Sequence, residues 1–483
     1  MSMKVNEQVL EKTIKRCRER NIIIPTFAQQ KDPSKIPQKI KDRLKGVGLW
    51  DINPVNLFRI TWKNDINTGM FGGVNFLEIP SEITGIKAKV VGIVGKYFPT
   101  GAHKVGAAFG CLVPRLVTGE FDPTTQKAVW PSTGNYCRGG AFDSVLLDTV
   151  PIAILPEEMS RERFEWLKEI GAEVIATKGC ESNVKEIYDA CWDIKKNRKD
   201  CVIFNQFEEF GNCIWHYHIT ASAIEEVFKS MPGKNKRLAC YVSATGSAGT
   251  IAAGDYLRKI SPHIKVAASE ALQCPTLLLN GFGGHRIEGI GDKHIPWIHN
   301  VRNTDAVVAI DDEACMRIFR LFNEEEGKSY LMKNGVSKNV VEKLSLLGIS
   351  GISNMLTAIK MAKYYEFDEN DYIFMPFTDS SEMYKSRLAE LNLSHGNYCE
   401  IKASVDSERY LKGVGIDYMR ELNYYDRKAI HNLKYYTWVE QQGRSVEELN
   451  DLWKPEFWDD MFSKVTEWDS MIEAFNKKTG LIA

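Results

Sequence analysis

The sequence predicts an α/β fold of parallel βαβ units, in a chain long enough for more than one domain, followed by a helical C-terminal extension. The chain has 483 residues, of which 44% are hydrophobic and 26% charged, so it can bury a large core. From about residue 53 to about residue 390, short β-rich apolar runs alternate with amphipathic helical segments. From about residue 395 the chain is rich in Trp, Tyr, Asp and Glu and shows helical patterns without strand signals. We interpret these late aromatic residues as packing or subunit contacts rather than catalytic groups.

The predicted strands are short apolar runs separated by helical segments. One of these helices, Ser160–Ile170, ends at Gly171, as helix stop signals predict. Strands that alternate with helices predict a parallel sheet with right-handed crossovers. The first 50 residues are polar and charged, with a helical stretch near Val9–Arg20. The predicted strands are Lys89–Val94, Lys127–Trp130, Val150–Leu155, Ala172–Ala176, Cys201–Asn205, Leu238–Val242, Lys265–Ala268 and Asp371–Met375.

Composition argues against several classes of protein. The formal net charge of -1 favours neither nucleic acid nor an anionic membrane as a partner. The N-terminus is too polar for a signal peptide, and no apolar run reaches the ~18–20 residues that span a bilayer. The 11 cysteines contain no CxxC pair, and the nine histidines form no metal-type cluster. We therefore expect a cytoplasmic protein with reduced thiols, no bound metal, no nucleic acid and no membrane partner.

Lys104 lies in a turn where its amine could become a nucleophile. A β-rich run leads into the Pro/Gly turn of residues 95–103, and Lys104 opens the amphipathic segment Val105–Arg115. A lysine that is partly desolvated at such a turn can lose its proton and form a Schiff base. Taken alone, a lysine at a loop–helix junction is more often a surface charge.

Two further turns follow apolar strands and are rich in small or hydroxylated residues. Pro131–Tyr136 brings backbone N–H groups to a helix start, which suits a carboxylate, and Asn135 could donate to a phenolate oxygen. A simple N-capped turn would have the same composition. Ser243–Thr250 suits a phosphate bound at a helix N-terminus. It lacks the Gly-Lys-Ser/Thr ending of a P-loop and is a poor dinucleotide fingerprint.

Together and in this order, the motifs resemble the fold-type II pyridoxal-phosphate (PLP) enzymes of the tryptophan synthase β-like superfamily. Within that family they are most similar to the cysteine synthase and cystathionine β-synthase branch. The resemblance rests on Thr100–Lys104, Ser132–Asn135, Asn205–Phe207 with Asn212 and His216-Tyr217, Gly246–Thr250, His285–Gly291 with Ile295-Pro296, Gly348–Gly351 and Asp379-Ser380.

The resemblance implies two domains, each with a twisted, mostly parallel sheet flanked by helices, with PLP in the cleft between them and a helical C-terminal extension. It implies an N-terminal extension over 1–52, a smaller PLP-fold domain over 53–210, a larger one over 211–394 and the extension over 395–483. A homodimer is expected on the same grounds.

The resemblance also assigns roles to individual residues. Lys104 would be catalytic and would hold the cofactor covalently. The expected cofactor-binding residues are Lys104, His103, Asn135, Ala244, Thr245, Gly246, Ser247, Ala248, Gly249, Thr250, Ser350 and Ser380. The expected substrate-binding residues are Ser132, Thr133, Gly134, Asn135, Tyr136, Gln206 and Gly289.

The implied function is β-elimination or β-replacement on a small L-amino acid (serine, cysteine or O-activated serine) through an aminoacrylate. Alternatives are tryptophan synthase β-like or dehydratase activity on another amino acid, and a non-catalytic PLP-fold binding subunit. The chain departs from its relatives at Ala102-His103 and Val105-Gly106 around the lysine, and at Ser247-Ala248. Tyr136 and Arg138 also differ from the residues of cysteine synthases. One interpretation is that they reshape the substrate side of the site, and the other is that Arg138 faces outward on a helix.

Overall fold

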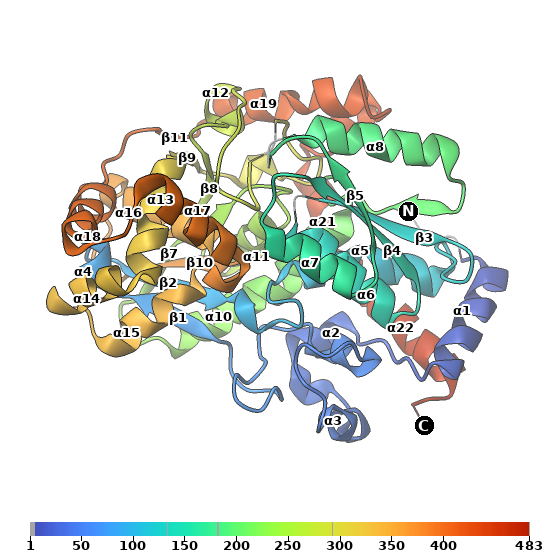
Figure 1. The fold of residues 1–483 in the computed structure, drawn as a ribbon. Coiled ribbons are helices and arrows are strands. Elements are labelled where there is room, and N and C mark those ends of the chain that lie inside the picture. The colour runs from blue at the N-terminus through green and yellow to red at the C-terminus, as the bar shows by residue number, and fades with distance from the viewer. Residues whose placement is uncertain (1–4, 133, 181–182, 292, 483) are drawn as a thin grey trace.

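Two β-sheets organise the chain in a computed structural model, which describes residues 5–132, 134–180, 183–291 and 293–482 (Figure 1). The larger sheet has seven strands in the order β1-β2-β10-β7-β8-β9-β11, and the smaller has four in the order β5-β4-β3-β6. The smaller sheet is wholly parallel, whereas the larger is parallel except at its edges, where β1 and β11 are antiparallel. Helices flank both sheets, which confirms the predicted fold class.

The strands have the following bounds. The larger sheet contains β1 (Phe76–Ile79), β2 (Lys89–Val94), β7 (Arg237–Ala244), β8 (Lys265–Ala271), β9 (Ala306–Ile310), β10 (Asp371–Phe377) and β11 (Met419–Glu421). The smaller sheet contains β3 (Lys127–Pro131), β4 (Val150–Pro156), β5 (Glu173–Thr177) and β6 (Cys201–Ile203).

The helices fall into four consecutive groups along the chain. Those before β2 are α1 (Glu7–Glu19), α2 (Phe27–Lys31), α3 (Gln38–Leu44) and α4 (Ser81–Thr84). Those up to β7 are α5 (Lys104–Thr118), α6 (Asn135–Leu146), α7 (Arg161–Glu169), α8 (Val184–Asn197), α9 (Phe210–Trp215) and α10 (Ala221–Ser230). Those up to β11 are α11 (Ala253–Ile260), α12 (Thr276–Leu279), α13 (Asp312–Asn323), α14 (Glu325–Lys333), α15 (Lys338–Lys343), α16 (Ile349–Tyr364), α17 (Lys385–His395) and α18 (Glu400–Ser407). The last are α19 (Tyr424–Asn432), α20 (Val446–Asp451), α21 (Pro455–Ser463) and α22 (Val465–Thr479).

Short helical turns connect these elements. The 3₁₀ turns are η1 (Pro33–Lys35), η2 (Pro54–Arg59), η3 (Gly95–Tyr97), η5 (Thr250–Ala252), η6 (Val301–Asn303), η7 (Leu344–Leu346) and η8 (Ser381–Tyr384). The π-helical turns are η4 (His216–Thr220), η9 (Glu408–Lys412) and η10 (Tyr435–Val439).

All eight predicted strands are present, with small shifts at their ends. Three strands were not predicted. The sequence predicts only helices after residue 395, and this is wrong at β11, whose polar run Met-Arg-Glu pairs on one side only, with β9. A polar edge strand carries neither an apolar run nor a clear alternation, so its sequence gives little signal. The predicted domain boundary at residue 210 stays a prediction, although β1 and β2, which lie before it, pair into the larger sheet.

The C-terminal extension packs onto the body of the protein and reaches the N-terminal helices. In Figure 1, α22 at the red end of the chain lies beside α1 at the blue end. Arg18 donates to the carbonyls of Lys478 and Thr479, and the Asp469 carboxylate accepts from two backbone N–H groups that open α2. Trp438, Trp458 and Trp468 belong to the main hydrophobic core. The predicted packing role of the extension's aromatics therefore agrees with the structure for these three tryptophans.

A helix that crosses a bilayer must be both long and apolar. Within the described ranges, no single helix is long and apolar enough to cross a membrane. One pair, Lys338–Leu346 and Ile349–Tyr364, meets the criterion only jointly, with a bend of 118° between its halves.

Glu270, on β8, makes the stability of the fold depend on pH. Its buried carboxyl group accepts from the N–H groups of Leu277 and Leu278 at 2.9 and 2.8 Å, yet burial raises its pKa to about 8. Between about pH 4.3, where an exposed Glu titrates, and pH 8, the unfolded chain loses this proton while the folded chain keeps it. The free energy of unfolding should therefore fall as pH rises through this window, by at most ~1.4 kcal/mol per pH unit from this group.

Urea unfolding of wild type and Glu270→Gln at several pH values between 5 and 8 tests whether Glu270 makes the free energy of unfolding depend on pH. The variant should gain stability over wild type as pH rises, because it has no proton to lose. A difference between the two proteins that stays constant with pH would show that Glu270 does not titrate in this window.

Candidate active site

A narrow cavity of about 20 Å³ lies where the three predicted turns meet. The turns follow β2, β3 and β7 at their carboxyl ends, which is where open parallel sheets bind ligands. The sequence predicted eight of the residues that line this cavity and missed Phe207, Ile290 and Thr378. The full lining is Lys104, Ser132, Asn135, Tyr136, Gln206, Phe207, Gly246, Ser247, Gly289, Ile290 and Thr378.

Lys104 is the first residue of α5, and its amine reaches the phosphate-type loop. Gly101, at φ +73°, turns the chain from η3 toward the helix, a conformation that glycine adopts without strain. The Lys104 Nζ donates to Ser247 Oγ at 3.0 Å and to Gln206 Oε1 at 3.3 Å. The lysine is therefore a lining residue with polar neighbours rather than a surface charge.

The loop at residues 246–250 borders the cavity through Gly246 and Ser247. Within the described part of the chain, the N–H groups of these residues form no hydrogen bond. Ala248 has φ +59°, and a Cβ on Gly249 would lie 1.9 Å from Asn212 Oδ1, so the loop is tightly curved over that side chain. Asn212 in turn donates to Ser247 Oγ at 3.0 Å. Free amides on a tight turn that opens a helix are the donor set that a phosphate group requires, so these residues fit PLP.

The loop after β3 and the start of α6 contribute Ser132, Asn135 and Tyr136 to the cavity lining. Gly134, at φ +148°, donates through its N–H to Ser132 Oγ at 3.1 Å, and Asn135 then begins α6. Asn135 Oδ1 is buried and has no hydrogen-bond partner among the described residues. The ring of Tyr136 packs against Trp130 in the core. Thr133, predicted as a substrate-binding residue, lies outside the described residues.

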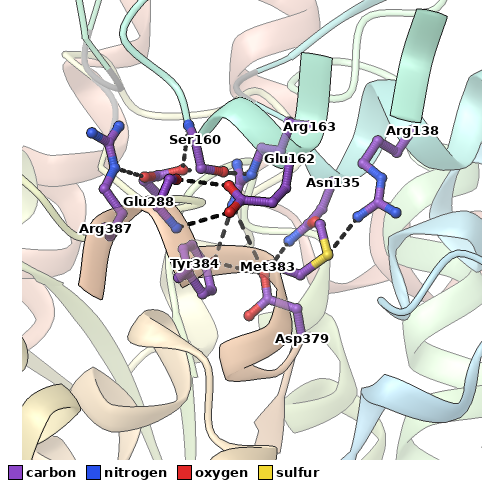
Figure 2. A network of polar contacts seen from close by, with 12 residues as sticks. Asn135, Arg138, Ser160, Glu162, Arg163, Glu288, Asp379, Met383, Tyr384 and Arg387 are labelled. Carbon is purple, nitrogen blue, oxygen red and sulfur yellow. Dashed lines mark hydrogen bonds and ion pairs between the residues drawn. The ribbon is translucent and has the colours of Figure 1, made fainter. Parts of the chain in front are cut away.

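A buried polar network stands behind this loop and joins α6 and α7 to the chain after β10 (Figure 2). Asp379 Oδ2 accepts from Asn135 Nδ2 and from the Tyr384 hydroxyl, both at 2.7 Å. Arg163 donates to the Tyr384 oxygen at 3.0 Å and lies 3.5 Å from Glu288 and 3.9 Å from Asp379. Burial raises the pKa of Asp379, although Arg163 and the two hydrogen bonds oppose this.

The network also includes residues at its two ends. At one end, Glu288 accepts from Arg387 Nε at 2.6 Å. At the other, Arg138 lies over the ring of Trp166, 4.6 Å from its centroid, and against Met383. Arg138 is buried. The interpretation of Arg138 as an outward helix residue is therefore wrong, and it does not line the cavity either.

Several predicted cofactor residues do not line the cavity. His103 is buried between Trp62 and His216, with Nε2 3.4 Å from Thr250 Oγ1. Burial, aided by the charge of Lys104, lowers the pKa of His103 to about 3, so this ring is neutral. Gly134, predicted as a substrate-binding residue, and the cofactor candidates Ala244, Thr245, Ala248, Gly249, Thr250 and Ser380 lie close in sequence to lining residues, whereas Ser350 lies on α16, which contributes no lining residue.

Comparison with known proteins agrees with this geometry. Residues 96–329 match the sequence family described as "Pyridoxal-phosphate dependent enzyme". A probable cysteine synthase of Bacillus subtilis (strain 168) is 29% identical over 230 residues, which are 47% of this chain and 72% of that protein. Cystathionine beta-synthase of Saccharomyces cerevisiae (strain ATCC 204508 / S288c) is 24% identical over 324 residues, 63% of this chain and 59% of the relative.

Among solved structures, the fold is similar to O-acetyl serine sulfhydrylase isoform 3 from Entamoeba histolytica. The TM-score is 0.57 at 22% identity, over 70% of this chain and 94% of that one. Residues 96–329 thus match the pyridoxal-phosphate dependent enzymes, in line with the fold-type II resemblance, and the chain is similar to cysteine synthases and cystathionine β-synthases.

Proposed function

We propose that the protein uses PLP, held covalently by Lys104, for β-elimination or β-replacement on a small L-amino acid such as serine, cysteine or an O-activated serine. The observation that carries the proposal is the position of the Lys104 amine. It lines one cavity together with Gly246 and Ser247, from the loop with free amides, and with Ser132 and Asn135.

Different groups of the protein would contact different parts of the cofactor. PLP, when bound, supplies an electron sink for bonds at the α-carbon of the substrate. The amides of residues 246–250 would hold its phosphate, Asn135 would donate to the phenolic oxygen, and Ser380 would face the ring nitrogen. A serine there donates a hydrogen bond without placing a charge beside the nitrogen. These residues would thus offer PLP hydrogen-bonding groups of the types that its phosphate, its phenolic oxygen and its ring nitrogen require.

Lys104 would have a second role whenever its amine is not bound to the cofactor. Its amine then stands beside the substrate, where a neutral form can accept the α-proton as a general base. Ser247 Oγ and Gln206 Oε1, 3.0 and 3.3 Å away, hold the amine on the cavity side of α5. A general base in this position contributes roughly 10²–10⁴-fold to the rate of such a step.

The remaining walls favour a small substrate. The Ser132–Asn135 loop and Gln206 would bind the substrate carboxylate through hydroxyl, amide and backbone N–H groups. Phe207 and Ile290 also line the cavity, and their apolar side chains would suit a short, neutral substituent at the β-carbon. Relatives such as a probable cysteine synthase and a cystathionine beta-synthase support this substrate class.

A spectral and product screen of the PLP-loaded full-length protein tests the proposal. L-Serine, L-cysteine and O-acetylserine are each added alone, then with sulfide or homocysteine, and the absorbance of the bound cofactor and the products are followed. At least one amino acid should change the spectrum and be converted. Pyruvate or sulfide released without a second substrate would indicate elimination, and product formed only with the second substrate would indicate replacement.

If none of these amino acids perturbs the spectrum of the bound cofactor or yields product, the proposal is wrong. Binding of PLP without any response to amino acids would instead favour a non-catalytic binding subunit.

A further inference from the structure

The C-terminal extension contacts one segment of the main body through side chains that donate to its backbone. We call residues 294–299 the wall segment. Trp438 Nε1, in η10, donates to the carbonyl of Ile295 at 2.8 Å. Lys434 Nζ, directly before η10, donates to the carbonyls of Trp297 and His299 at 2.9 and 2.7 Å. Three alternate carbonyls of the wall segment are thus bound by two side chains of the extension.

The wall segment, in turn, packs on a residue that lines the cavity. The N–H of Ile298 donates to the carbonyl of Phe207 at 3.3 Å. The ring of His294 lies 5.0 Å from the ring of Phe207 on one side and 5.7 Å from that of Trp438 on the other. Phe207 follows Gln206, which accepts from the Lys104 amine. A short chain of contacts therefore runs from the extension to the reactive lysine.

A second contact holds the same region from the end of η10. Arg444 donates to Glu208 at 2.9 Å, and its guanidinium lies over the ring of Trp297, 5.4 Å from the centroid. Glu208 is two residues beyond Gln206. The extension therefore contacts both the wall segment and the turn after β6, which carries Gln206 and Phe207.

The burial of these donors shows that the contact is specific. Trp438 and Lys434 are both fully buried, at 0% exposure. Within the described residues Lys434 forms no ion pair, so carbonyl oxygens alone solvate this amine. A buried ammonium is costly unless its hydrogen bonds are satisfied, so a hydrophobic contact alone would not place a lysine here. Burial lowers the pKa of Lys434 well below its ordinary value, in line with this cost.

We propose that the C-terminal extension is part of the active-site wall, with Lys434 and Trp438 as positioning residues that hold Phe207 and Gln206 against Lys104 through the wall segment. The extension lies beyond residue 329, where the family match ends, so this support belongs to this chain rather than to the matched family region. The effect on catalysis rests on the proposed function, whereas the effect on the wall segment does not.

Two substitutions remove the donors and two matched ones serve as controls. Trp438→Phe removes the bond to Ile295 and keeps an aromatic ring, and Lys434→Met removes both bonds of the lysine at similar length. Trp458→Phe removes an equivalent buried indole bond, to the carbonyl of Leu452 within the extension itself. Lys402→Met removes two lysine-to-carbonyl bonds that lie away from the wall segment.

Hydrogen exchange and steady-state kinetics of the four full-length, PLP-loaded variants separate a positioning role from a structural one. In Trp438→Phe and Lys434→Met, the amides of residues 205–208 and 294–299 should exchange about tenfold faster or more, because their local support is lost. The same two variants should raise KM for the amino acid about tenfold with a smaller change in kcat, since substrate binding depends on Gln206 and Phe207. The controls should lower thermal stability comparably without either change.

Equal effects of the four variants on exchange and KM would overturn the proposal and leave only a stabilising role for the extension. If the wild-type enzyme converts no amino acid, the proposed function fails separately. The exchange experiment then still decides whether the extension holds the wall segment.

Discussion

Replacing Lys104 with alanine should abolish covalent attachment of PLP and lower turnover by at least roughly 10²–10⁴-fold, because the same amine would hold the cofactor and accept the α-proton. The wild-type protein should be yellow and absorb near ~410–430 nm, as PLP bound to a lysine does. The Lys104→Ala variant should lose this band after gel filtration, while the amides of residues 246–250 still bind the cofactor weakly through its phosphate.

Lys96→Met is the matched control for this substitution. Lys96 lies in the same turn but forms an ion pair with Glu382 at 2.6 Å and is partly exposed. This variant should keep both the absorbance band and turnover, since a partly exposed pair contributes little. If Lys104→Ala kept the band and full activity, Lys104 could not be the attachment site, and another lysine would have to be sought.

The parts of the site that could be predicted are those that depend on local sequence. Lys104, the 246–250 loop and the Ser132–Asn135 loop each follow a buried strand and open a helix, and strand ends of a parallel sheet meet at one edge. Residue type and chain order, through the resemblance to fold-type II PLP enzymes, were therefore enough to bring them together. His103 stays a prediction as a cofactor residue. Successive residues at a helix start point about 100° apart, so Lys104 lines the cavity while the His103 ring packs against Trp62.

The buried network and the wall segment could not be predicted, because their partners are far apart in sequence. Arg163 and Tyr384 are separated by 221 positions, and Trp438 and Ile295 by 143. An arginine in the charged helix α7 has the composition of an exposed residue, and only the packing of α7 against the chain after β10 buries it. Hydrophobic periodicity gives the buried face of a helix but does not identify the partner of a buried charge.

Replacing Arg163 with methionine should destabilise the fold by about 3–5 kcal/mol, because it removes a buried cation beside the buried Asp379 carboxyl group and leaves Glu288 with Arg387 alone. Arg163 is fully buried between Glu288, 3.5 Å away, and Asp379, 3.9 Å away. A Cβ on Gly134 would lie 2.1 Å from its guanidinium, so the arginine also supports the loop that ends at Asn135. Loss of the arginine should therefore weaken binding of an amino acid as well as stability.

The loss of stability in Arg163→Met should also depend on pH. Without the arginine, the pKa of Asp379, already raised by burial, should rise further above its unfolded value. A carboxyl group with a raised folded pKa destabilises the fold as pH rises above its unfolded pKa, so the loss should be larger at pH 8 than at pH 5. Urea unfolding of wild type and Arg163→Met at pH 5 and pH 8 measures the loss in free energy of unfolding.

Arg161→Met, two residues earlier on α7, is the matched control. Arg161 pairs with Glu165 at 3.2 Å, but its side chain is 75% exposed, so its removal should cost under about 1 kcal/mol at either pH. Similar losses for the two arginines would mean that the buried network contributes no more than a surface pair. A much larger loss for Arg163, growing with pH, would show that one buried cation joins α7 to the chain after β10 and supports the substrate-carboxylate loop from behind.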